Sequence, residues 1–253
     1  MSVLPQPLPR LKVREYRFGP EAFATPTLAH DDIHVWRQSL ALGPSDVESF
    51  CSLLSPDELE RAGRFRFDTD RSDFIVSRGT LRTLLGSYLG VPPQELRFAY
   101  SEFGRPSLVA RTPSNMLDFN VSHSSGVVLL AFALGRKIGI DVEKVRQDFG
   151  TAEIAERFFS MAERAALRKL PPEQRHEAFF RCWTRKEAFI KALGEGLSHP
   201  LDQFDVSLAP GEPAAILATR PDGEEVRRWL LWNVQVPGDY AAALAAESGN
   251  GPG

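Results

Sequence analysis

The stretch IGIDVE, residues 138–143, contains the pattern that decides the fold of the second half of the chain. Side chains alternate between the two faces of a β-strand, so the aliphatic residues share one face and Gly139, Asp141 and Glu143 share the other. The pattern predicts a strand with one face on a core and two adjacent carboxylates opposite. Such like charges repel unless a cation joins them, and Mg²⁺ prefers oxygen ligands. The alternative is an edge strand with a solvated acidic face.

Downstream of this strand, residues 173–193 have the spacing of a long helix that ends before Gly194. Trp183, Glu187 and Lys191 are four residues apart and fall on one helix face, with Lys186 as a neighbour. This face is interpreted as a third carboxylate with two ammonium groups for phosphate charge. The alternative is a solvated surface pair between Glu187 and Lys191.

Upstream, residues 117–134 read as a β-hairpin whose polar turn is SHSSG, residues 122–126. A hydroxyl from Ser122, an imidazole from His123 and exposed backbone N–H groups could contact a phosphate. The turn could equally carry an incidental histidine. A hydrolase triad is disfavoured because the chain has no Gly-x-Ser-x-Gly elbow.

The two halves of the chain repeat one pattern at a constant offset of 105 residues. A strand, a helix that starts at Ser with Glu three residues later, and a long helix recur: Ile33/Ile138, Ser55/Ser160, Glu58/Glu163, Phe74/Phe179. We therefore expect an α+β fold of two similar, pseudo-twofold halves, each a small mainly antiparallel sheet packed with a long helix. The expected boundaries are 1–135, including an extended lead-in at 1–29, then 136–246, and a disordered tail at 247–253. The active site would lie at the junction.

Composition excludes several classes of protein. The 253 residues carry a net charge of −3, which argues against a generally basic nucleic-acid binder. Two cysteines cannot form a disulfide framework or a four-thiolate zinc site. The longest apolar run, 127–134, is too short for a membrane-spanning helix. A cytoplasmic protein without a membrane or nucleic-acid partner is expected.

Three motifs together resemble those of 4′-phosphopantetheinyl transferases of the larger, monomeric Sfp type. They are FNVSHS (119–124), GIDVE (139–143) and WTRKEAFIK (183–191), in the family's order and spacing. The resemblance covers roughly residues 55–208 and the short strand at 33–36. The family is also known for two similar α+β halves, as expected from the repeat.

The resemblance implies roles for individual residues. Asp141, Glu143 and Glu187 match the Mg²⁺ ligands, and Lys191 matches the lysine on the transferring phosphate. The remaining matches are contacts to coenzyme A, namely His123 and Ser122 for its phosphates, Arg61 for its nucleotide, and Tyr100, Gly104 and Arg105 in the segment that lines the adenine pocket. Glu58 departs from the pattern, since some relatives have a basic residue there. The 3′-phosphate subsite is therefore left to Arg61, Arg64 or Arg78.

The implied reaction is Mg²⁺-dependent transfer of 4′-phosphopantetheine from coenzyme A to a serine of an apo acyl or peptidyl carrier protein, with adenosine 3′,5′-bisphosphate released. Glu187, Lys191 and His123 would be catalytic, with Glu187 or a metal-bound water as the base. Carrier docking is expected on an apolar patch at 149–161, with Arg146 and Arg157 at its rim. The alternatives are another Mg²⁺-dependent phosphoryl enzyme, such as a nuclease, and a non-catalytic module that binds coenzyme A or carriers. Which carrier is served stays open.

Overall fold

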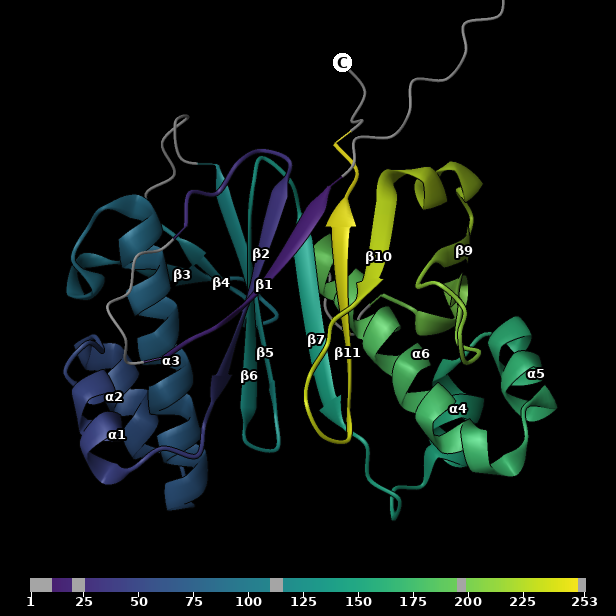
Figure 1. Ribbon diagram of the computed structural model, residues 1–253, viewed down its shortest axis with the longest axis horizontal. Helices are drawn as coiled ribbons and strands as arrows, with labels where there is room; N and C mark the ends of the chain where they lie inside the picture. The colour runs from purple at the N-terminus through teal and green to yellow at the C-terminus, as the bar shows by residue number, and fades with distance from the viewer. Residues whose placement is uncertain (1–10, 20–25, 110–115, 195–198, 250–253) are drawn as a thin grey trace, which may run out of the picture.

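The computed structural model describes residues 11–19, 26–109, 116–194 and 199–249. Figure 1 shows helices on both outer sides of the molecule and strands between them. Two sheets pack face to face, and each sheet has one long helix on its outer face. The result is a four-layer α/β/β/α arrangement, which confirms the predicted α+β class.

The first half contains a four-stranded sheet in the order β1-β2-β6-β5. Strands β1 and β2 are parallel, and the other neighbours are antiparallel. A separate hairpin is formed by β3 and β4. The elements are β1 (Lys12–Arg17), β2 (Asp32–Ser39), α1 (Pro44–Cys51), α2 (Pro56–Gly63), α3 (Asp68–Leu89), a 3-10 turn (Pro93–Glu95), β3 (Phe98–Tyr100), β4 (Pro106–Leu108), β5 (Leu117–Ser124) and β6 (Val127–Leu134).

The second half contains a three-stranded antiparallel sheet in the order β10-β11-β7 and a small β8-β9 hairpin. Its elements are β7 (Ile138–Lys144), α4 (Thr151–Phe158), α5 (Met161–Lys169), α6 (Pro172–Leu193), β8 (Phe204–Val206), β9 (Ile216–Thr219), β10 (Trp229–Asn233) and β11 (Tyr240–Glu247), with 3-10 turns at Leu201–Gln203 and Gly223–Arg228.

Three apolar cores hold the layers together. Helix α3 packs on the outer face of the first sheet, where Leu84 of α3 and Phe132 of β6 belong to one core. Ile140 of β7 and Leu129 of β6 belong to the core between the two sheets. Helix α6 packs on the outer face of the second sheet, where Phe189 is fully buried. Burial of about 1.5–3 kcal/mol per large apolar side chain makes these cores the main stabilising contribution.

A ladder of side chains joins the two halves along β5 and β7. Every second residue of β5 presents an oxygen that accepts a hydrogen bond from a β7 backbone N–H, so the two strands run in parallel. The four rungs are Asp118 to Ile138 N (3.3 Å), Asn120 to Ile140 N (2.9 Å), Ser122 to Val142 N (3.3 Å) and Ser124 to Lys144 N (3.1 Å). At this junction, side-chain oxygens of β5 thus accept the hydrogen bonds that backbone carbonyls accept in an ordinary sheet.

The two halves share a buried ion pair at equivalent places. Glu58 closes the capping box of α2 and meets Arg82 of α3, with 2.6 Å between Glu58 Oε2 and Arg82 Nε. Glu163 closes the capping box of α5 and meets Lys186 of α6, with 2.8 Å between Glu163 Oε2 and Lys186 Nζ. Each cation also donates to carbonyls in the loop after its own helix. The glutamates keep the offset of 105 residues, whereas the offset from Arg82 to Lys186 is one residue shorter.

Two local predictions are wrong. Strand β5 continues through Ser124, so the hairpin turn contains only Ser125 and Gly126, whose φ angles are 42° and 88°. Ser122 and His123 therefore lie in a strand, because the tight turn leaves their pairing with β6 intact. The predicted tail also begins too early, since Glu247 ends β11 and Ser248 is fully buried. Residues 250–253 lie outside the described part, as do 1–10 and 20–25 of the predicted lead-in.

Candidate functional site

Asp141 and Glu143 lie on the face of β7 that is turned toward helix α6, opposite the aliphatic face in the core between the sheets. Gly139 shares the carboxylate face. A Cβ atom at Gly139 would lie 2.1 Å from the backbone oxygen of Ala188 and 2.4 Å from the nitrogen of Ala192. The missing side chain lets the backbone of α6 rest directly on β7. This close approach brings the helix residues 187 and 191 to the carboxylates.

Lys191 bridges the two halves at this point. Its Nζ atom lies 2.7 Å from Asp141 Oδ1 and 3.0 Å from Ser122 Oγ. Ser122 in turn donates to Asp141 Oδ1 at 2.9 Å. The Asp141 carboxylate is almost fully buried and the Lys191 side chain is about one quarter exposed, so the ion pair is largely shielded from water. Lysine, serine and aspartate thus form a closed triangle of charge-assisted hydrogen bonds.

Glu143 lies beside this triangle and is half-buried. It accepts a hydrogen bond of 2.9 Å from the Ser124 hydroxyl. Burial raises the pKa of Glu143, and repulsion from Asp141 raises this pKa further, whereas the Ser124 hydrogen bond lowers it. The carboxylate is therefore held close to a second negative charge at a cost that a cation would relieve.

Among the carboxyl groups of this cluster, Glu187 has the pKa that is raised most. Burial is the main cause that raises its pKa to about 7; repulsion from Asp141 adds to it, attraction to Lys191 opposes it, and repulsion from Glu143 makes the smallest contribution. Glu187 Oε1 is buried and has no hydrogen-bond partner among the described residues, and the same holds for Asp141 Oδ2. Such perturbed, unsatisfied carboxylates are typical of functional sites.

The carboxylate oxygens fit a hard cation by chemistry, and Asp141 Oδ2 and Glu187 Oε1 offer unpartnered atoms for one. Within the described ranges, however, no three His, Cys, Asp or Glu side chains converge closely enough to hold a metal ion as they stand. Lys191 occupies Asp141 Oδ1 instead. Coordination of one ion by Asp141, Glu143 and Glu187 would therefore require Lys191 to leave Asp141 and at least one of the three carboxylates to move.

His123 projects from β5 next to the ladder and is exposed. Partial burial of the ring lowers the pKa of His123, and the Lys191 ammonium lowers this pKa further, while Asp73 of helix α3 opposes both effects. Its neighbours thus come from both halves.

The other predicted coenzyme A residues lie around the β3–β4 hairpin. The Arg78 guanidinium lies 5.0 Å from the ring centre of Phe98 and 5.7 Å from that of Tyr100. Arg61 stacks over Phe74, with 5.2 Å to the ring centre. Gly104 has a φ angle of 77° in the hairpin turn, a conformation that favours glycine. Tyr100 is exposed, so this aromatic and basic cluster reaches the surface.

Three residues proposed for the 3′-phosphate subsite differ in their partners. Arg64 pairs with Glu60 on the surface. Arg78 is buried and lies 3.5 Å from Glu58. Glu58 departs from the family's basic pattern because its carboxylate closes a capping box and neutralises Arg78 and Arg82. Arg61 is exposed and makes its described contact with an aromatic ring, which leaves its guanidinium accessible to an anion.

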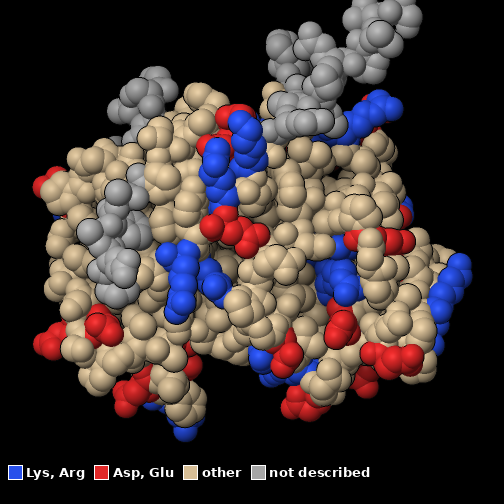
Figure 2. Space-filling model, in the orientation of Figure 1, with Lys and Arg blue, Asp and Glu red and all other residues tan. Residues whose placement is uncertain are grey.

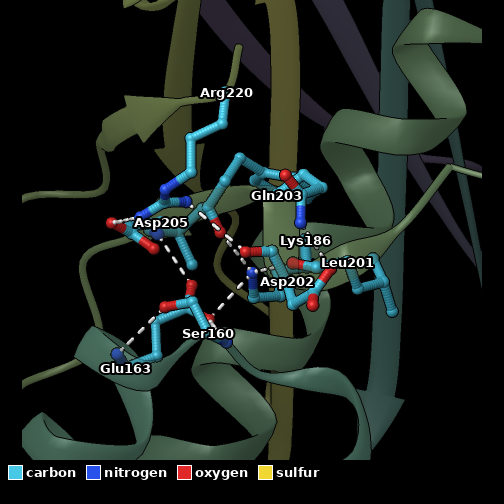
Figure 3. A network of polar contacts seen from close by, with 10 residues as sticks. Ser160, Glu163, Lys186, Leu201, Asp202, Gln203, Asp205 and Arg220 are labelled. Atoms are coloured by element: carbon cyan, nitrogen blue, oxygen red, sulfur yellow. Dashed lines mark hydrogen bonds and ion pairs between the residues drawn. The ribbon is translucent and has the colours of Figure 1, made fainter.

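The predicted phosphate role of Lys186 does not fit the structure. Its side chain is fully buried, and Nζ contacts Glu163 as well as the backbone oxygens of Leu201 and Phe204 at 2.6 and 2.7 Å. Figure 3 shows this network between α5, α6 and the loop before β8. Lys186 lies one residue from Glu187 on a helix and therefore points to a different side.

The guanidinium of Arg105 does not fit its predicted coenzyme A contact either. Arg105 Nη1 donates to the Lys191 backbone oxygen at 2.6 Å, and Nη2 donates to Asp118 Oδ2 at 3.0 Å. Nη2 also lies 3.2 Å from the Ile138 oxygen. The side chain therefore ties the β3–β4 hairpin to the end of α6 and to the β5–β7 junction.

An aromatic pocket opens beside Glu143 and Ser124. It has a volume of about 310 Å³ and is lined by Ser124, Ser125, Glu143, Arg146, Phe149, Ile154, Phe179, Phe180 and Trp183. Trp183 and Glu143 thus line the same pocket. Sequence reasoning missed Ser124 and Phe180. The alternation of polar residues along 118–124 was the available signal for Ser124.

Figure 2 shows acidic and basic side chains interspersed over the described surface of one face, without a continuous basic stripe there. No helix in the described part of the chain is long and apolar enough to cross a membrane. The mixed charge on this face gives no support to a nuclease, which would need a broad basic track along a phosphate backbone.

Two family models match the chain. The model of the 4′-phosphopantetheinyl transferase superfamily matches residues 137–245, and that of the 4′-phosphopantetheinyl transferase N-terminal part matches residues 42–134. The 4′-phosphopantetheinyl transferase HetI of Nostoc sp. is 41% identical over 225 residues, which cover 89% of this chain and 91% of the relative.

A second relative is the 4′-phosphopantetheinyl transferase Sfp of Bacillus subtilis, which is 34% identical over 167 residues, covering 66% of this chain and 72% of the relative. Among solved structures, the holo-[acyl-carrier-protein] synthase of Thermotoga maritima matches with 24% identity and a TM-score of 0.35. That match covers 44% of this chain and 62% of the other.

Proposed function

This chain belongs to the 4′-phosphopantetheinyl transferase superfamily, and on that premise we propose that it transfers 4′-phosphopantetheine from coenzyme A to a serine of an apo acyl or peptidyl carrier protein. Adenosine 3′,5′-bisphosphate is the leaving product. The family makes the chain a transferase of the holo-carrier-protein synthase class. The substrate, the metal and the residue roles below belong to the proposal.

One observation carries it. Lys191, Asp141 and Ser122 form a triangle at the junction of the two halves, with Glu143 and Glu187 beside it. This places an ammonium group and three carboxylates within one small, partly shielded site. With a divalent cation on its carboxylates, such a site could neutralise the charge of a pyrophosphate, and a carboxylate could accept a proton from a hydroxyl.

Asp141, Glu143 and Glu187 would hold Mg²⁺, which fits their oxygen chemistry and the two unpartnered carboxylate atoms. The ion would supply charge neutralisation on the phosphate oxygens. Within the triangle the Lys191 ammonium is paired with Asp141, and it can turn from there to a bound phosphate. Lys191 therefore stabilises charge at the transferring phosphate in this proposal.

Coenzyme A would lie across the junction from the β3–β4 hairpin to Lys191. His123 on β5 binds its phosphates, and Arg61 is the accessible arginine for the nucleotide end. The Ser122 hydroxyl, which was also predicted to contact a phosphate, is buried and donates its proton to Asp141. Tyr100 and the turn at Gly104 offer an exposed aromatic surface and backbone for the adenine ring. The N-terminal half would thus bind the nucleotide, and the C-terminal half would hold the metal and the carrier.

Glu187 is our candidate for the proton acceptor. Without a metal its pKa is raised to about 7, chiefly by burial, and a bound Mg²⁺ would lower this pKa again. Glu187, or a metal-bound water, would therefore remove the carrier serine proton during attack on phosphorus.

The carrier would dock at the aromatic pocket next to Glu143. Phe149, Ile154 and Trp183 provide its apolar wall, and Arg146 at its rim is exposed and attracts an acidic partner. Arg157 and the strongly exposed Met161 extend the surface along α4 and α5. We also propose, from the sequence resemblance, a cytoplasmic monomer whose partners include no nucleic acid and no membrane.

The proposal is tested by following adenosine 3′,5′-bisphosphate release by chromatography. Coenzyme A, Mg²⁺ and an apo carrier protein are incubated with the wild-type protein or with Asp141→Ala. Product should form only when enzyme, coenzyme A and apo carrier are all present, and Asp141→Ala should form almost none. Carrier-independent release would indicate a hydrolase. Tight coenzyme A binding without release on any of several apo carriers would indicate a non-catalytic module.

A further inference from the structure

The four rungs of the β5–β7 ladder are chemically of two kinds. Asp118 and Asn120 accept from the N–H groups of Ile138 and Ile140. The serine rungs, Ser122 and Ser124, accept in the same way and in addition donate their hydroxyl protons to carboxylates. Thus Ser122 donates to Asp141 Oδ1 and Ser124 to Glu143 Oε2, each at 2.9 Å.

The two serine rungs repeat one geometry two residues apart. Each hydroxyl takes the N–H of one β7 residue and donates to the side chain of the residue before it. Ser124 accepts from Lys144 N at 3.1 Å while donating to Glu143. A hydroxyl has one proton, so the backbone contact anchors the oxygen and leaves that proton for the carboxylate. The rotation of the Glu143 carboxylate is thereby fixed from the other half of the molecule.

We propose that Ser124 is a positioning residue that orients Glu143 toward the metal ion. This inference rests on the proposed function, because it concerns the metal site assigned there. Hydrogen bonds to ligating carboxylates fix their orientation, and loss of such a partner typically weakens metal binding by about 10–100-fold. The ladder then couples the geometry of the carboxylates to the docking of the two halves.

Ser124 is suited to a clean test. It is half-buried at the end of the ladder, so Ser124→Ala removes one rung and leaves the other three in place. Ser124→Thr keeps the hydroxyl and should retain the contact. Asn120→Ala is the matched control, because it removes a rung opposite Gly139, where β7 has no carboxylate.

The experiment measures Mn²⁺ binding to the full-length, coenzyme A-loaded protein by electron paramagnetic resonance of the free ion. Ser124→Ala should bind Mn²⁺ at least about tenfold more weakly than wild type, whereas Ser124→Thr and Asn120→Ala should stay within about threefold. Wild-type affinity in Ser124→Ala would overturn the inference. An equal loss in Asn120→Ala would also overturn it, because Mn²⁺ affinity would then depend on the loss of any rung. An equal loss in Ser124→Thr would do the same, because the affinity would then depend on local packing rather than on the hydroxyl. Should Asn120→Ala not fold, the comparison of alanine with threonine decides.

Asp141→Ala separates this inference from the proposed function. If Asp141→Ala loses Mn²⁺ while Ser124→Ala keeps it, only the positioning role of Ser124 fails. If Asp141→Ala binds Mn²⁺ as wild type does, the metal assignment in the proposed function fails first.

Discussion

Replacing Glu187 by glutamine should stabilise the folded protein while it removes transferase activity. Folding transfers this carboxyl into a buried place near Asp141 and Glu143, and its pKa rises from 4.5 to about 7. A folded-state pKa above the unfolded value means that the folded state binds the proton more tightly. The ionised Glu187 therefore costs stability as pH rises from about 4.5 to 7, and the full cost persists above 7.

The size of the effect follows from the shift. Each pKa unit corresponds to about 1.4 kcal/mol, so a rise from 4.5 to about 7 corresponds to about 3 kcal/mol at pH 8. Glutamine removes this charge but also gives up the attraction of Lys191 for the carboxylate. We therefore expect Glu187→Gln to raise the free energy of unfolding by about 1–3 kcal/mol at pH 8.

The assay is guanidinium unfolding of metal-free protein at pH 8, 7, 6 and about 4.5, with transfer measured on the same samples. The stabilisation should shrink as pH falls and nearly vanish at the lowest pH, where the wild-type carboxyl is protonated in the folded state and about half protonated in the unfolded state. Glu177→Gln is the matched control, because it makes the same change at an exposed position of the same helix. A variant that is no more stable than wild type at pH 8, or a gain equal to that of the control, would refute the reasoning.

Three further substitutions test other parts of the structure. Lys191→Ala should lower kcat by about 10²–10³-fold, because a donor to the transferring phosphate is lost; thermal unfolding should also report a loss of about 1–3 kcal/mol, since Asp141 loses its partner. Lys186→Met should destabilise the protein by about 3–5 kcal/mol by leaving Glu163 unpaired, and the kcat of the folded fraction should stay at the wild-type value; a tenfold lower kcat in folded protein would contradict the structural role. Gly139→Ala should prevent stable packing of α6, as its Cβ would lie 2.1 Å from the Ala188 oxygen, and a wild-type melting temperature would show that the close approach is wrong.

Much of the fold follows from local patterns in the sequence. The capping boxes that begin at Ser55 and Ser160 predict the starts of α2 and α5, because Ser and Glu three residues apart satisfy the first N–H groups of a helix. Alternation along 138–143 predicts β7 and its two faces. The packing of the two sheets face to face was not predicted, because an apolar face in the sequence does not show which other face it packs against.

The site was harder to predict because its residues were assigned from type and spacing. Lys186 and Arg105 were themselves predicted as site residues, yet their charged groups contact oxygens of the protein. Nothing in the local sequence shows that Glu163 needs a cation, or that the carbonyl of Lys191 needs a donor. The helix spacing also suggested a Glu187–Lys191 pair, whereas the ammonium of Lys191 meets Asp141 across the layers.

The role of Ser124 illustrates the same limit. Asp118, Asn120, Ser122 and Ser124 alternate along β5, but polar alternation is also typical of a strand with a solvated face. Only the parallel placement of β5 and β7 shows that these side chains replace backbone pairing between the halves.

The most direct test of the account is the intact mass of the carrier protein after reaction. Several apo carriers, each with a variant in which the acceptor serine is alanine, are incubated with the enzyme, coenzyme A and Mg²⁺ and then weighed by mass spectrometry. At least one carrier should gain the mass of one phosphopantetheine group, and its serine variant should gain none. If no carrier gains this mass, or if Asp141→Ala modifies the carrier at the wild-type rate, the transferase site described here is wrong.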